Sequence, residues 1–211
     1  MDIVIQNFTV QATVPIFWCN LASVRPYLLL ARQAIDELRV SHPDSTPSNV
    51  RSVYMSPWKS HQHNGKLAPI CNHVIQVAKK ASVEYFNTDL QKLNFDLRVT
   101  DCWGAIYEKN DHTIAHNHFP SDFAAAIYLE AEADCAPIIF ADSLSIQPVP
   151  ETLILFPGML NHSVPPNTGA RRVVLAMNLQ KIPSFPNPTC RKKATRGWLF
   201  VKGTGPVLLL T

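Results

Sequence analysis

The sequence is poor in charged residues and lacks several familiar motifs. Asp, Glu, Lys and Arg make up 17% of the 211 residues, hydrophobic residues make up 46%, and the formal net charge is +3. Such a weak charge does not indicate a nucleic-acid partner, and the apolar content is typical of a globular chain rather than a disordered one. There is no P-loop, GxGxxG, CxxC pair or nucleophile elbow, so no motif supports nucleotide binding or acyl transfer.

The sequence also gives no sign of secretion or membrane insertion. Its five cysteines are odd in number and scattered, which is typical of free, mostly buried thiols in a reducing compartment. No apolar run reaches the ~18 residues needed to cross a bilayer. The first residues, MDIVIQNFTV, contain no basic segment of the kind that starts a signal peptide. We therefore expect a cytoplasmic protein without membrane contact.

The first half of the chain is expected to be partly helical. The first 20 residues alternate loosely in hydrophobicity, which favours a strand or two. Apolar residues recur at helical spacing over 24–39 and again over about 68–87. The segment 41–69 between them contains four prolines and predicts a long irregular connection.

After Leu93 the pattern changes to short runs rich in branched and aromatic residues. These predict strands at about 95–108, 123–131, 137–141, 152–157, 162–164 and 171–179. Strands at this spacing favour an antiparallel sandwich or barrel, with the helices covering one outer face. We predict a single domain over 1–211. Residues 1–94 would form the strand or strands and supporting helices, 95–182 the β core with the functional site, and 183–211 a C-terminal extension.

Three histidines in the second half suggest a metal site. His116 and His118 stand at i and i+2, so an extended segment would point both to the same side. His162 follows the apolar run TLILF and a Pro-Gly turn that can bring it back toward the first pair. Three protein ligands on one side of an ion leave open positions, which redox chemistry requires.

An arginine ten residues after His162 suggests an acidic cosubstrate. Arg171 and Arg172 are adjacent on a predicted strand, so one of the two should face inward. A buried guanidinium offers two parallel donors to a carboxylate. Histidines together with an inward arginine suit iron(II) and a keto acid.

These segments resemble the 2-oxoglutarate/iron(II) oxygenases, and in particular a poorly characterised bacterial and phage branch of them. The matching segments are WGAIYEKNDHTIAHNHFPSDFAAAIYLE, LILFPGMLNHSVPPN and RRVVLAMNL, within about residues 97–180. The resemblance implies a double-stranded β-helix, the jelly roll shared with cupins. It implies that His116 and His162 bind iron(II), and that Arg172 binds the distal carboxylate of 2-oxoglutarate with help from Tyr128.

The chain departs from this family at the third metal ligand. Most members carry Asp or Glu two residues after the first histidine, where this chain has His118. We expect His118 to be the ligand, because i+2 spacing keeps both groups on one side. Asp122 and a water molecule are the alternatives. Trp103 and Tyr107 precede the metal segment and are candidates for the substrate mouth.

The predicted function is an iron(II)- and 2-oxoglutarate-dependent oxygenase, a hydroxylase that uses O2. Its substrate would be a small molecule, an amino acid or a peptide. Two alternatives remain open. One is a cupin-type dioxygenase with three histidines and no 2-oxoglutarate, and the other is a jelly roll that binds a metal or ligand without turnover.

Overall fold

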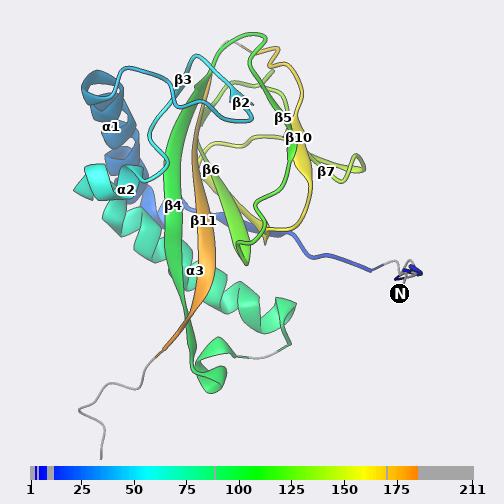
Figure 1. The fold of residues 1–211 in the computed structure, drawn as a ribbon. Helices are drawn as coiled ribbons and strands as arrows, with labels where there is room; N and C mark the ends of the chain where they lie inside the picture. Colours follow the sequence, from blue (N-terminus) through cyan, green and yellow to red (C-terminus); the bar gives the residue numbers. More distant parts are fainter. Residues whose placement is uncertain (1–2, 4, 9–11, 88, 170, 185–211) are drawn as a thin grey trace, which may run out of the picture.

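The computed structural model describes residues 3, 5–8, 12–87, 89–169 and 171–184, and its core is formed by two antiparallel sheets. Figure 1 shows helices on one side of the strands β4 and β11, and the strands β5, β10 and β7 on the other side. Most of the predicted extension 183–211 lies outside the described residues. Within the described ranges, no helix is long and apolar enough to cross a membrane.

The two sheets have the strand orders of a double-stranded β-helix, which confirms the predicted fold class. The six-stranded sheet has the order β1 (Phe17–Asn20), β9 (Thr152–Pro157), β6 (Phe123–Ala131), β11 (Arg172–Pro183), β4 (Phe95–Tyr107) and β3 (Tyr54–Met55). The five-stranded sheet has the order β2 (Val50–Arg51), β5 (His112–His116), β10 (His162–Val164), β7 (Ile138–Phe140) and β8 (Leu144–Ile146).

Two long helices cover the outer face of the six-stranded sheet, α1 (Arg25–Ser41) and α3 (Ala68–Tyr85). Both carry proline in the first turn, where the missing amide hydrogen leaves no bond unmade. Gly104 lets α1 approach β4, because a Cβ at this position would lie 2.5 Å from the fully buried side chain of Ile35. Short helical turns complete this layer: η1 (Ala22–Val24), α2 (Ser60–His63), η2 (Gly65–Leu67) and η3 (Leu90–Leu93).

Successive residues of the central strands alternate between two apolar clusters. In β11, Val173 and Leu175 pack with the helices, whereas Val174 between them packs toward the five-stranded sheet. In β9, Leu155 and Phe156 divide in the same way. Successive side chains of a strand point to opposite faces, so one stretch of sequence builds both the supporting core and the wall of the interior.

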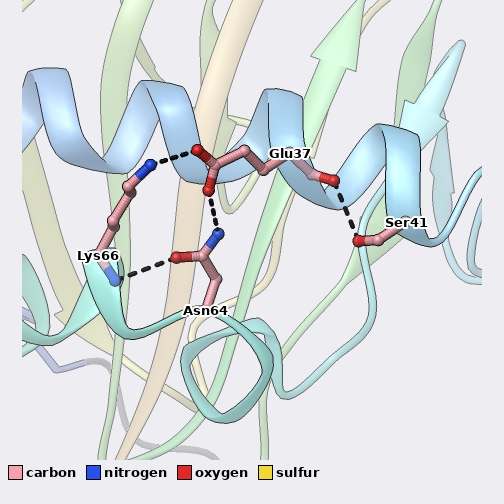
Figure 2. A network of polar contacts seen from close by, with 4 residues as sticks. All are labelled: Glu37, Ser41, Asn64 and Lys66. Atoms are coloured by element: carbon pink, nitrogen blue, oxygen red, sulfur yellow. Dashed lines mark hydrogen bonds and ion pairs between the residues drawn. The ribbon is translucent and has the colours of Figure 1, made fainter.

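The connection between α1 and α3 is more ordered than the sequence predicts, since it contains β2, β3 and α2. A polar network fastens it to α1 (Figure 2). Asn64 Nδ2 donates to Glu37 at 2.8 Å, and the same carboxylate forms an ion pair with Lys66. The Lys66 amide donates to Asn64 Oδ1 at 3.0 Å. The connection is therefore held where it crosses α1.

Candidate metal centre and cosubstrate cavity

Three imidazoles meet at one end of the space between the two sheets. His116, His118 and His162 each offer a nitrogen, and these atoms all lie within 4.8 Å of one another. His116 ends β5 and His162 begins β10, and the two are direct cross-strand partners. Their ring centroids are 4.4 Å apart, and the His118 ring lies 4.9 Å from one and 5.0 Å from the other. Among the described residues, these three histidines form the one cluster of potential ligands that could hold a metal ion.

Backbone carbonyls orient two of the rings. His116 Nδ1 lies 2.8 Å from the Ile114 carbonyl, and His162 Nδ1 lies 3.2 Å from that of Leu160. A carbonyl oxygen only accepts, so Nδ1 carries the proton in both rings, and Nε2 is left as the free electron-pair donor. Metal-binding histidines are commonly oriented by such a second hydrogen bond.

Burial keeps the three histidines uncharged. Burial, together with the neighbouring His162 and His116, lowers the pKa of His118 to about 3. Burial and the proximity of His116 lower the pKa of His162 to about 4, and burial also lowers the pKa of His116. Neutral imidazole is the form that binds a metal, so the site needs no proton release at neutral pH.

His118 lies beyond the end of β5, and the expectation that it shares a strand with His116 is wrong. The loop that carries it is held by main-chain bonds to the turn before His162. The His118 amide donates to the Gly158 carbonyl at 2.6 Å, and the Gly158 amide donates to the Asp122 carbonyl at 3.1 Å. A Cβ on Gly158 would lie 2.2 Å from the Ser121 carbonyl oxygen. The two loops approach this closely because residue 158 is glycine.

Arg172 lies at the other end of the same cavity and is 1% exposed. Its NH1 group donates to the Ala136 carbonyl at 2.8 Å, and its guanidinium carbon lies 4.1 Å from the centre of the Tyr107 ring. Its Nε is buried without a hydrogen-bond partner, and no ion pair with another described residue includes it. Tyr128 lines the cavity too, and burial raises the pKa of its hydroxyl to about 12, so it stays protonated and can donate.

Two other predicted residues lie away from the three histidines. Asp122, the alternative third ligand, accepts a bond from the Lys181 amide at 2.7 Å and forms an ion pair with Lys181 Nζ at 3.0 Å. Arg171 points to the opposite face from Arg172 and pairs with Glu130 at 3.2 Å. The predicted division between the two arginines thus matches their orientations.

The cavity continues into a wider groove. Val50, Trp103, His116 and His118 line both spaces. Trp103 therefore lies at the boundary between them, and its role at a substrate mouth stays a prediction. Tyr107 does not, since it lies at the closed end under Arg172 and its hydroxyl bonds that of Thr113 at 2.8 Å. Tyr107 in β4 lies directly opposite Arg172 in β11. This pairing joins strands distant in sequence, so it could not be predicted from the sequence.

Solved structures confirm the fold that the motifs predicted. A prolyl-4-hydroxylase from Pseudomonas putida is 15% identical, with a TM-score of 0.55, over 80% of this chain and 94% of that one. The viral collagen prolyl hydroxylase of Paramecium Bursaria Chlorella virus-1 is also 15% identical, with a TM-score of 0.53, over 78% and 94%. The carbocyclase SnoK from nogalamycin biosynthesis, which depends on alpha-ketoglutarate, is 10% identical, with a TM-score of 0.60, over 79% of each chain.

No family model matches the sequence, and no curated protein matches it either. At these identities the structural likeness establishes the fold, which is that of the 2-oxoglutarate/iron(II) oxygenases. A fold hosts many activities, so an argument about function has to come from the residues in the cavity.

Proposed function

We propose that the chain is an iron(II)- and 2-oxoglutarate-dependent oxygenase that hydroxylates its substrate. The observation that carries this proposal is Arg172, a buried cation without a carboxylate partner among the described residues, in the same cavity as the three histidines. An unpaired buried charge is unfavourable by several kcal/mol. The keto acid's distal carboxylate would supply the missing counter-charge.

The donor set suits iron(II), although it also suits other divalent metals. Imidazole binds Zn, Cu, Fe and Ni, and three protein ligands leave positions open for a chelating cosubstrate. In this proposal His116, His118 and His162 hold the ion, with His118 replacing the carboxylate that the family usually has. Bound iron(II) would supply the activation of O2.

The other cavity residues would bind and enclose the keto acid. Arg172 would pair with the distal carboxylate, and Tyr128 would donate a hydrogen bond to it. The Tyr107 ring holds the guanidinium from one side, through a contact of the cation–π type. The rest of the wall is apolar, with side chains such as Val174, Ile138 and Phe156 limiting the access of water.

The two alternative functions fit these contacts less well. A cupin-type dioxygenase that uses three histidines and no keto acid does not need a buried cation in its cavity, whereas this chain places Arg172 there. A binding protein without turnover has no need for an open metal site beside a second cavity. The substrate would be a small molecule, an amino acid or a peptide. The similar structures include both peptide and small-molecule enzymes by their names.

The decisive experiment is to measure conversion of 2-oxoglutarate to succinate. With iron(II), ascorbate and O2, the protein should form succinate slowly even without its substrate, and this can be followed by NMR. The matched control is His162→Ala, which removes one imidazole. If the wild type forms no more succinate than this variant, including with a broad panel of amino acids and peptides, the proposal is wrong.

A further inference from the structure

The groove outside the metal centre has a composition unlike that of the cavity within. It has a volume of about 320 Å³, which is enough for a small side chain or metabolite. Its walls combine the aromatic rings of Trp58, Trp103 and Phe119 with the polar groups of Asp101 and Asn178. Phe119 is 78% exposed and Trp58 40% exposed, so the groove opens to solvent past two aromatic rings.

Two paired rows of inward-facing residues connect the closed end of the cavity to this groove. Alternate residues of β4 lie opposite alternate residues of β11, in the pairs Tyr107–Arg172, Ala105–Val174, Trp103–Ala176 and Asp101–Asn178. The first pair has a cation at the closed end, and the last has an anion in the groove. The metal centre lies between these ends, since the His118 ring is 5.9 Å from the Trp103 ring.

Asp101 is held in place by its neighbours but is not neutralised by them. Its Oδ2 accepts bonds from Thr100 Oγ1 at 3.1 Å and Asn178 Nδ2 at 3.3 Å. The strand register shifts at this point, so Thr100 is an extra residue beside the pair. Such bulges reorient side chains next to functional sites.

The other carboxylate oxygen of Asp101, Oδ1, is available to bind a ligand. In the described part of the chain, no hydrogen bond to Oδ1 and no ion pair with Lys or Arg is formed. The nearby His61 does not compensate, because burial lowers its pKa and keeps its ring neutral.

We propose that this groove binds a positively charged group of the substrate, an ammonium or a guanidinium, through Asp101 and the faces of Trp58 and Trp103. The proposal rests on the proposed function and adds the substrate class to it. The two tryptophan rings meet edge to face with centroids 4.8 Å apart, so they form one aromatic corner beside the carboxylate. Carboxylate and aromatic ring are the two protein groups that attract a cation most strongly.

The spacing also limits where the charge lies in the substrate. Asp101 is two residues beyond Trp103, which corresponds to about 7 Å along a strand. A substrate whose reactive carbon lies at the metal centre would therefore carry its cation a few bonds away. A free basic amino acid or amine and a basic side chain in a peptide share this chemistry.

The test compares charged and neutral probes of similar size by NMR titration. The probes are n-butylammonium, n-butylguanidinium and 1-pentanol, each added to the protein with and without Zn²⁺ and 2-oxoglutarate. We expect the two cations to bind at least about tenfold more tightly than the alcohol. Asp101→Asn, which keeps the side-chain shape, should remove this preference. Glu84→Gln on α3, which removes the same charge on the helical layer, should leave it unchanged.

Three results would overturn the proposal. These are equal binding of cation and alcohol by the wild type, a preference that survives in Asp101→Asn, and equal losses for both probes in Trp58→Leu. The wild-type comparison decides even if a variant fails to fold. Succinate formation is measured separately. If the protein forms succinate but shows no preference for cations, the cation-binding proposal is rejected and the proposed function is not. A panel of L-lysine, L-arginine and a terminally blocked lysine peptide then separates the two sources of the charge.

Discussion

The two faces of the six-stranded sheet use the same strands for different purposes. The face toward α1 and α3 is apolar along the central strands, with Leu175 and Leu155 among its buried residues. The face toward the five-stranded sheet interrupts its apolar wall with Arg172, Tyr128 and Asp101. Because neighbours in the chain alternate between these faces, stability and ligand binding should respond to substitutions at adjacent positions almost independently.

The largest expected effect is on stability and lies on the helical face. Leu175 is fully buried there, so Leu175→Ala should lower the free energy of unfolding by about 2–5 kcal/mol. Chemical denaturation measures this loss. Metal and keto-acid affinities of the folded variant should match the wild type. If they fell as much as in the cavity variants below, the two faces would not be separable.

On the cavity face, the next largest effect should come from His118, the proposed third metal ligand. His118→Ala removes one of three imidazoles and should weaken metal binding about a hundredfold or more, as measured by competition with a chelator. Asp122→Ala should leave metal affinity unchanged, because that carboxylate is bound to Lys181. The reverse ranking would assign the site to the carboxylate, and no effect from either variant would support two histidines with water.

Replacing the buried cation should affect the cosubstrate but not the fold. Arg172→Leu should raise the 2-oxoglutarate concentration needed for succinate formation about tenfold or more, since about 1.5–3 kcal/mol of charge-assisted hydrogen bonding is lost. Its free energy of unfolding should fall far less than that of Leu175→Ala, because a buried charge without a counter-ion is removed as well. An unchanged keto-acid requirement would favour the cupin-type alternative.

The smallest effect is expected one residue earlier in the chain. Arg171→Leu removes the same charge from the opposite face, where it forms a partly exposed pair with Glu130. Such pairs contribute about 0–1 kcal/mol, so both stability and keto-acid requirement should stay near wild type. If Arg171→Leu matched Arg172→Leu in the succinate assay, the keto-acid site would need to be placed elsewhere.

Much of the fold could be predicted from the sequence, because hydrophobic residues recur with a regular period along its long helices and strands. The strands at 123–131, 152–157 and 162–164 have the predicted bounds, and both long helices begin and end within two residues of them. The strands β2, β3 and β8 were not predicted, since two or three residues are too few to show alternation. Their existence depends on partners distant in sequence.

The site was readable in part, for a similar reason. The spacing of His116 and His118 indicated a shared site, and the alternation of Arg171 and Arg172 indicated that one faces inward. The sequence did not show that His118 lies in a loop, because a main-chain bond to Gly158 positions it. Asp101 was missed although it has the same parity as Trp103 and Tyr107, a signal that becomes visible once the inward face of β4 is known.

The contact at Gly158 sets the position of His118 in the proposed metal centre through the main chain alone. The loop that carries residue 118 is joined to the turn before His162 through backbone amides and carbonyls, which every amino acid except proline possesses. The identity of the side chain at 118 therefore contributes little to where its Cα lies. His118 could therefore be replaced by aspartate without moving the backbone. Residue 158, by contrast, admits no side chain, because a Cβ there would meet the Ser121 carbonyl. In the proposed site, the type of side chain at residue 118 and the position of that residue are therefore set by separate parts of the sequence.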